Sequence, residues 1–162
     1  MIVLGNGKTL ISAWSPTPAR VVREALKLAD VQADDVLYDL GCGDGRVVVS
    51  ACRQFGAHAT GFDVSPKRIR QTMRRIKSNS VEHLATARCQ DLRQIPDFHN
   101  ATVIYMYLPQ KVLNSLGHRL LRDCAPGTRV LSLQTWIYHW PTDKELVVRI
   151  RNHRWHIGLW LV

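Results

Sequence analysis

The most constraining feature of this sequence of 162 residues is an apolar run that ends in three closely spaced glycines and continues as a helix. Residues 36–40 have the length and apolar character of a buried parallel strand. Gly41, Gly43 and Gly45 follow at once, and residues 46–55 show helical periodicity. Glycine has no Cβ, so its backbone can turn tightly and approach a ligand closely. The pattern predicts a strand–turn–helix unit that binds a ligand, although a purely structural turn would look the same.

Strands and helices alternate along most of the chain. Besides the helix at residues 46–55, the periodicity and proline positions predict helices at residues 19–29, 66–78 and 110–124. The further strands are predicted at residues 58–64, 82–89, 101–108, 129–135, 145–151 and 155–162. Such alternation indicates an α/β fold, a mostly parallel sheet with helices on both faces. The turn-prone pair Asn152-His153 makes the last two strands an antiparallel hairpin.

Length and composition limit the possible classes of protein. The chain suits one domain over residues 1–162, with a lead segment at 1–15. We expect it to be cytoplasmic, because it has no signal-peptide core and no apolar stretch of the roughly 18 to 20 residues that a membrane helix needs. The four cysteines lack paired spacing, so no metal site is expected. The net charge of +9 favours an acidic or polyanionic partner, or serves solubility alone. Nothing in the sequence indicates the oligomeric state.

Two aspartates follow neighbouring strands of the predicted sheet. Asp63 ends the second predicted strand, and Asp91 comes just after the third. The carboxyl ends of parallel strands meet at one edge of a sheet, so these carboxylates should share a crevice with the glycine turn. Asp63 is positioned to accept hydrogen bonds from the ribose hydroxyls of a nucleoside. A helix cap or a turn is the alternative role for each aspartate.

The glycine spacing separates two classes of cofactor. A dinucleotide fold has the pattern G-x-G-x-x-G, in which a helix start meets a pyrophosphate. This chain has G-x-G-x-G, and Asp44 would put a carboxylate where the diphosphate should lie. We therefore expect a ligand that carries a positive ammonium or sulfonium group.

These segments resemble those of a known family. Residues 38–46 and 61–66 resemble the first and second motifs of class I methyltransferases that use S-adenosylmethionine. More narrowly, residues 16–18, 35–46 and 126–130 resemble the small protein-lysine methyltransferases of archaea and their mitochondrial relatives. The resemblance covers the chain from about Thr17 to the final hairpin. It implies a Rossmann-like class I methyltransferase fold with seven strands, the last of them antiparallel.

The same resemblance implies roles for particular residues. The methionine part of S-adenosylmethionine would contact the glycine turn and the aspartate before it. The ribose would bind Asp63, while Asp91 and Leu92 would flank the adenine. The residues that this assigns to the cofactor are Asp39, Gly41, Gly43, Gly45, Asp63, Asp91 and Leu92. On the acceptor side, Pro109 and Trp140 would face the substrate.

Methyl transfer from a sulfonium is an in-line displacement that needs alignment more than acid or base groups. A lysine acceptor, with an ordinary pKa of about 10.4, must first lose a proton, which a water-poor aromatic channel favours. Tyr105 and Tyr107 are the candidates for catalytic residues in that channel. Alternation along a strand puts both on one face, although core packing would do the same.

Two features leave the acceptor open. Relatives often carry a His and a Phe after the fifth strand, where this chain has Ser132-Leu133-Gln134-Thr135-Trp136. Residues 67–77 form a strongly basic helix, which is either a solvated face or a guide for an acidic protein or RNA. The sequence therefore predicts a methyltransferase acting on protein lysine. The alternatives are methylation of RNA or of a small metabolite, and a cofactor-binding subunit without catalysis.

Overall fold

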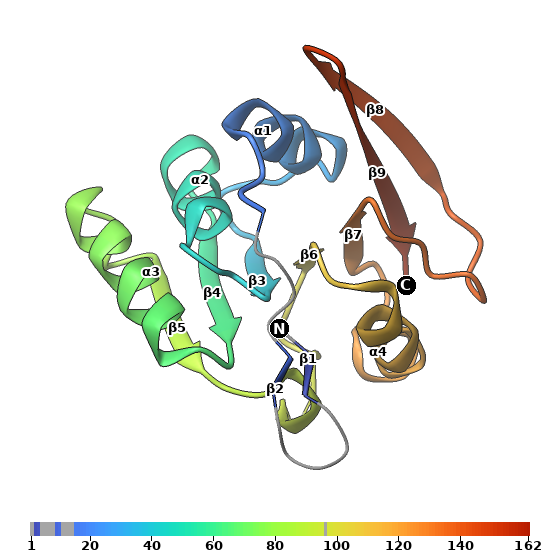
Figure 1. The fold of residues 1–162 in the computed structure, drawn as a ribbon, viewed down its shortest axis with the longest axis horizontal. Coiled ribbons are helices and arrows are strands. Elements are labelled where there is room, and N and C mark those ends of the chain that lie inside the picture. Colours follow the sequence, from blue (N-terminus) through green and yellow to red (C-terminus); the bar gives the residue numbers. More distant parts are fainter. Residues whose placement is uncertain (1, 4–8, 11–14, 96) are drawn as a thin grey trace.

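The computed structural model describes residues 2–3, 9–10, 15–95 and 97–162. Its centre is a seven-stranded sheet with the strand order β5-β4-β3-β6-β7-β9-β8 (Figure 1). The strands from β3 to β7 are parallel, β9 is antiparallel to β7, and β8 is antiparallel to β9. The strands are β3 (Val36–Leu40), β4 (His58–Asp63), β5 (Ala85–Cys89), β6 (Val103–Met106), β7 (Arg129–Leu133), β8 (Lys144–Ile150) and β9 (His153–Leu161). The predicted fold class is confirmed.

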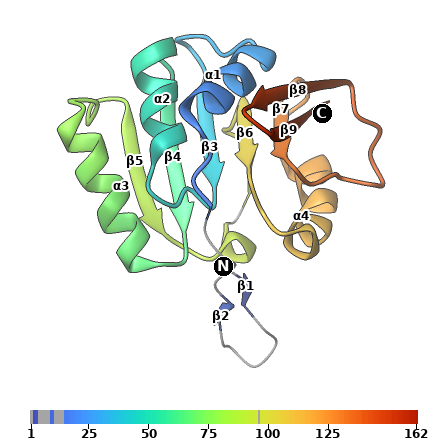
Figure 2. The same ribbon diagram turned by 45° about the horizontal axis from the view of Figure 1, so that its top comes forward.

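Helices cover both faces of the sheet (Figure 2). Apolar side chains of the first three helices join one core cluster with Leu37 of β3 and Leu131 of β7. Those of the fourth helix join a second cluster with Leu40 of β3 and Trp160 of β9, on the opposite face. The helices are α1 (Ala19–Leu28), α2 (Arg46–Phe55), α3 (Pro66–Ser78) and α4 (Gln110–Asp123). A 3-10 helix, Leu92–Gln94, was not predicted.

The helix boundaries follow from their end residues. α2 begins after Gly45 and ends before Gly56, and both glycines have positive φ. α3 begins after Ser65, whose side chain accepts a hydrogen bond from the Arg68 backbone, and Pro66 occupies its first turn. These two helices match the predicted bounds, because glycine and proline mark helix ends in the sequence itself.

Two predicted boundaries are wrong. The third predicted strand begins at Ala85 instead of residue 82, because the backbone N–H groups of Leu84 and Ala85 both donate to the Val81 carbonyl and form a turn. The hairpin turn is Arg151-Asn152 instead of Asn152-His153, since Ile150 pairs with His153 across the hairpin. Both errors come from local pairing that residue type does not reveal.

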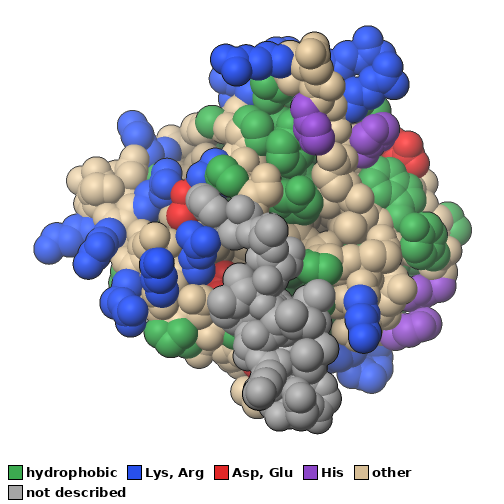
Figure 3. Space-filling model, viewed as in Figure 1, with side chains coloured by type: hydrophobic (Ala, Val, Ile, Leu, Met, Phe, Trp, Pro, Cys, Tyr) green, Lys and Arg blue, Asp and Glu red, His purple; other side chains and the backbone are tan. Residues whose placement is uncertain are grey.

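Most of the predicted lead segment, residues 1–15, lies outside the described residues. Within it, β1 (Ile2–Val3) pairs with β2 (Thr9–Leu10) in antiparallel register. No described helix combines the length and apolar character that a bilayer crossing needs. The cytoplasmic location stays a prediction. Lys and Arg side chains gather over α3 and around the turn between β8 and β9 (Figure 3).

Candidate active site

The glycine turn is held between β3 and α3. The Thr72 hydroxyl of α3 donates a 3.0 Å hydrogen bond to the Gly43 carbonyl. A Cβ on Gly45 would lie 2.5 Å from the Thr72 methyl group, and Gly45 also has a φ of +78°. A Cβ on Gly41, with φ at +89°, would lie 2.8 Å from Leu108. Glycine is therefore required at both positions by backbone conformation and by packing.

Asp63 points at this turn from the end of the neighbouring strand β4. Its Oδ2 accepts a 3.1 Å hydrogen bond from the Gly43 backbone N–H. Its Oδ1 accepts one of 2.8 Å from the Ser65 N–H. A carboxylate has about four acceptor positions, so both oxygens can still accept bonds from a ligand. The two contacts fix the direction of the carboxylate, and the predicted meeting of Asp63 with the glycine turn is present.

A cavity of about 520 Å³ opens at the carboxyl ends of β3, β4 and β6. It is the kind of crevice in which open α/β sheets bind ligands. It brings together six of the predicted site residues: Asp39, Gly41, Asp63, Tyr105, Tyr107 and Pro109. The other residues that line it are Ser15, Pro16, Thr17, Cys42, Asp44, Arg46, Val47, Ser65, Lys67, Arg68, Leu108, Gln134 and Thr135.

Two buried polar groups in this cavity are unsatisfied. Among the described residues, the Oδ2 of Asp39 and the hydroxyl of Tyr105 have no hydrogen-bond partner. Asp39 and Tyr105 are paired in register on β3 and β6, and each side chain is only 2% exposed. A buried polar group without a partner is costly, so a pair of them in a cavity marks a place for a ligand.

Burial sets the charge states of this pair. Burial, followed by the charges of Asp63 and Asp44, raises the pKa of Asp39 well above its ordinary value. Burial, and then the charge of Asp39, raises the pKa of Tyr105. Tyr105 is therefore a neutral hydroxyl at physiological pH. Asp39 is a carboxylate that a cationic ligand would stabilise in its ionised form.

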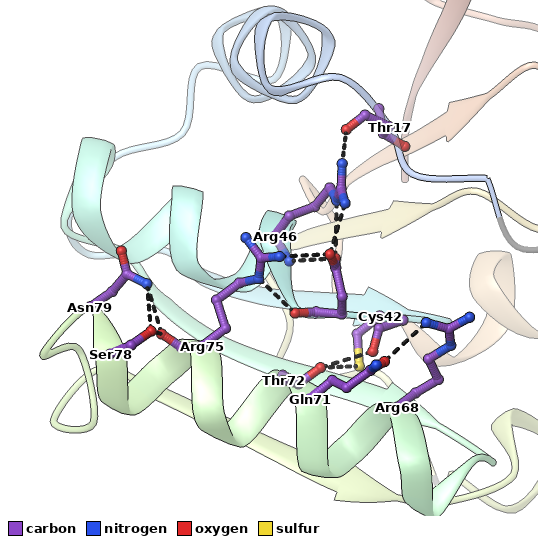
Figure 4. A network of polar contacts seen from close by, with 11 residues as sticks. Thr17, Cys42, Arg46, Arg68, Gln71, Thr72, Arg75, Ser78 and Asn79 are labelled. Atoms are coloured by element: carbon purple, nitrogen blue, oxygen red, sulfur yellow. Dashed lines mark hydrogen bonds and ion pairs between the residues drawn. The ribbon is translucent and has the colours of Figure 1, made fainter.

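The structure corrects the role given to Asp44. Its Oδ2 lies 2.7 Å from the Nη2 of Arg46 and 2.7 Å from that of Arg75. Burial by itself would raise the pKa of Asp44, but hydrogen bonds from Arg46 and the charges of Arg46 and Arg75 lower it. Arg46 also donates a 2.6 Å bond to the Thr17 carbonyl and so ties the segment before α1 to the turn (Figure 4). Asp44 is thus neutralised by two arginines, and Asp39 is the carboxylate left for a cation.

Other predicted site residues lie outside the cavity lining. Asp91 accepts hydrogen bonds from the Arg93 backbone and side chain, and these bonds, acting with the charge of Arg93 against a smaller effect of burial, lower the pKa of Asp91. Leu92 and Trp140 pack in the core cluster beside α4. The Trp140 carbonyl accepts a 2.8 Å bond from the Trp160 indole. Their roles at the adenine and at the acceptor stay predictions.

The wall of the cavity next to β6 and β7 involves residues that sequence reasoning missed. The Tyr107 ring packs edge-on against Trp155 of β9, with centroids 5.9 Å apart. Gln134, just after β7, has a φ of +59°. Its Oε1 accepts a 2.9 Å bond from the His156 N–H, and its Nε2 donates a 3.1 Å bond to the Arg154 carbonyl. The signal in the sequence was the departure from the family pattern at residues 132–136.

The family follows from comparison with known proteins. The model of the ANTKMT methyltransferase domain matches residues 39–144. This chain belongs to that methyltransferase family. The methyltransferase is also similar to a protein-lysine N-methyltransferase of Saccharolobus islandicus, with 34% identity over 92% of each chain. A human lysine N-methyltransferase named for an ATP synthase subunit is 28% identical over 66% of this chain, which spans about half of that protein, 45% of its length.

Solved structures agree with this assignment. The methyltransferase matches the crystal structure of an RNA methyltransferase from Salinibacter ruber in complex with S-adenosyl-L-homocysteine, with a TM-score of 0.83 and 35% identity. The match covers 91% of this chain and 93% of that one. TrmN from Thermus thermophilus, 16% identical with a TM-score of 0.70, shares the fold over 87% of this chain and 48% of that one. The resemblance to class I methyltransferases that the motifs predicted is confirmed.

Proposed function

We propose that this methyltransferase transfers a methyl group from S-adenosylmethionine to lysine side chains of proteins. The observation that carries the proposal is the cavity between the glycine turn and β6, which contains an unpartnered carboxylate and an unpartnered hydroxyl. The 34% identity over 92% of both chains to a protein-lysine N-methyltransferase supports lysine as the acceptor.

The residues present fit S-adenosylmethionine. Its methionine part carries an ammonium group, which Asp39 would bind through the oxygen that has no partner. Its ribose hydroxyls would donate to Asp63, whose direction Gly43 and Ser65 already fix. When bound, the cofactor supplies an electrophilic methyl group on a sulfonium.

The remaining residues of the cavity would hold the acceptor. Tyr105 lies in register beside Asp39 and stays protonated, so its hydroxyl would orient the acceptor nitrogen through a hydrogen bond. Tyr107, backed by Trp155, would provide an aromatic wall that excludes water. A lysine ammonium that leaves water for this wall loses its proton more easily, because desolvation disfavours the charged form. The freed lone pair of the amine is the nucleophile in the displacement.

RNA is the second candidate acceptor. The observation that favours it is the 35% identity and TM-score of 0.83 to a protein described as an RNA methyltransferase. Against it, the cavity is lined by a buried carboxylate and two tyrosines and, among the described residues, has no exposed array of aromatic rings on which bases could stack. This comparison leads us to place protein lysine first.

The test is a labelling experiment with methyl-labelled S-adenosylmethionine. The purified protein is incubated with separate protein and RNA fractions, and the labelled products are hydrolysed and identified. We expect label in methyl-lysine, removed by protease and untouched by nuclease. Asp63→Ala, which should abolish cofactor binding, serves as the matched control for contaminating activity. Label confined to RNA would overturn the choice of acceptor, and no labelling by the wild type beyond that control would overturn the proposal as a whole.

A further inference from the structure

The β8–β9 hairpin projects beyond the end of its neighbour at the side of the cavity. β7 ends at Leu133, which pairs with Ile157, whereas β9 begins at His153. The residues 153–156 therefore extend past β7 by roughly 13 Å, at about 3.3 Å for each strand residue. The overhang adjoins the cavity, because the cavity residue Gln134 donates a 3.1 Å bond to the Arg154 carbonyl.

The tip of this hairpin holds three exposed arginines, Arg149, Arg151 and Arg154. Arg149 and Arg154 are directly opposite each other across the two strands. Like charges in such a pair destabilise a sheet. Among the described residues, no carboxylate forms an ion pair with any of the three. The arrangement is unfavourable in the protein by itself.

The turn adds a second unfavourable choice. Arg151 has a φ of +53° in a two-residue hairpin turn, a position for which glycine and asparagine are suited. A bulky residue in the left-handed region is a genuine outlier. Local rules are most often broken at functional sites, where a ligand compensates the cost. The missing partner of these three guanidinium groups is an anion.

We propose that this arginine patch, Arg149, Arg151 and Arg154, binds acidic residues that flank the acceptor lysine in a protein substrate. The inference rests on the proposed function, because it places the acceptor lysine in the adjoining cavity. Guanidinium groups bind carboxylates through paired hydrogen bonds, so the patch complements a Glu- or Asp-rich segment. Figure 3 shows the basic side chains on both sides of the hairpin turn.

Two features favour a peptide over RNA as the occupant. The tryptophans of the hairpin, Trp155 and Trp160, are buried, so no indole is available for base stacking. β8 pairs only with β9 among the described residues and so forms the edge of the sheet. The backbone groups of an edge strand are suited to an extended peptide.

The test compares two synthetic peptides, each with a central lysine, flanked by glutamates in one and by glutamines in the other. Binding of the fluorescent peptides is measured by anisotropy, and methylation by transfer of label. We expect Arg149→Gln/Arg154→Gln to weaken binding of the glutamate peptide roughly fivefold and to raise its KM likewise, with kcat unchanged. The glutamine peptide should bind both proteins equally weakly. High salt should remove the difference, since exposed charges are screened.

The matched control is Arg70→Gln/Arg74→Gln on α3, which removes the same charge from exposed positions away from the cavity lining. This variant should bind the glutamate peptide like the wild type. Equal loss in both double variants, or equal binding of the two peptides by the wild type, would overturn the inference. So would a hairpin variant that loses only binding to a single-stranded RNA oligonucleotide. Failure of the proposed function looks different, because peptide binding would persist while no lysine became labelled.

Discussion

The two walls of the cavity are built in opposite ways. On the side of β3 and β4, the glycine turn, Asp63 and Thr72 contact one another within one short stretch of sequence, residues 41–72. On the side of β6 and β7, Tyr107 packs against Trp155, and Gln134 binds the backbone of β9. The cofactor side is local in sequence and tightly bonded, whereas the acceptor side is assembled from distant segments.

This difference explains how such a fold can change its acceptor and keep its cofactor. Substitutions near Gln134 or in the hairpin alter the acceptor wall without touching the bonds between Asp63, Gly43 and Ser65. The comparison predicts that variants of the first wall change cofactor affinity, while variants of the second change turnover or the KM of the acceptor.

The largest effect is expected for Asp63→Ala on the cofactor side. It removes two hydrogen bonds from a charged acceptor to the ribose, each contributing about 1.5–3 kcal/mol, so cofactor affinity should fall about 100-fold or more. Isothermal titration with S-adenosylmethionine measures this change. Thermal unfolding should shift by about 2–4 °C, because the Gly43 and Ser65 N–H groups also lose their acceptor. An affinity within threefold of the wild type would remove Asp63 from the cofactor site.

Asp39→Asn should weaken cofactor binding about 30-fold at neutral pH, since it removes a charged partner of the ammonium group. Burial and the charges of Asp63 and Asp44 raise the pKa of Asp39, and binding requires its ionised form. Wild-type affinity should therefore increase as the pH rises through that raised pKa. The variant should lack this dependence, which titrations over a pH series would reveal. A parallel pH dependence in both proteins would contradict the assignment.

Stability provides the control for the same substitution. A carboxyl group whose pKa is higher in the folded than in the unfolded state costs stability when ionised, and the cost disappears as the pH falls through the folded-state pKa. Asp39→Asn should thus raise the melting temperature of the cofactor-free protein at neutral pH and have a smaller effect in acid. The gain in stability together with the loss of binding would distinguish a functional carboxylate from a structural one.

The same contrast decides what the sequence predicts. The strand–turn–helix unit and α3 were predicted with their bounds, because glycine, serine and proline act on the backbone next to them. The start of β5 was not, since it depends on a turn at Val81 that residue type leaves open.

Within the site, the sequence predicted that Asp63 meets the glycine turn but misplaced the free carboxylate. Asp44 carries the negative charge nearest to the last glycine, yet Arg75 of α3, 31 positions away, neutralises it together with Arg46. Gln134 was noticed only as a departure from a family pattern. Its partners are in β9, at least 19 positions further along the chain, and their approach depends on the register of β7 and β9.

On the acceptor side, Tyr105→Phe should lower kcat about tenfold and leave cofactor affinity within twofold of the wild type. The hydroxyl has no partner among the described residues, so its removal breaks no internal bond there and should not reduce stability. Single-turnover measurements with saturating cofactor separate the methyl-transfer step from binding. An unchanged rate would leave Tyr105 as a core residue.

The smallest effect should come from Gln134→Ala, which tests whether the acceptor wall is independent of the cofactor wall. The substitution removes the side-chain bonds to Arg154 and His156, while the left-handed backbone remains. The overhanging hairpin then loses one attachment to the cavity rim, so the KM for a protein acceptor should rise about threefold, the equivalent of one ordinary hydrogen bond. Cofactor affinity should not change, because no bond of Gln134 reaches Asp39, Asp63 or the glycine turn among the described residues. A fall in cofactor affinity as large as the rise in KM would show that the two walls act as one unit, and the separation between them would have to be abandoned.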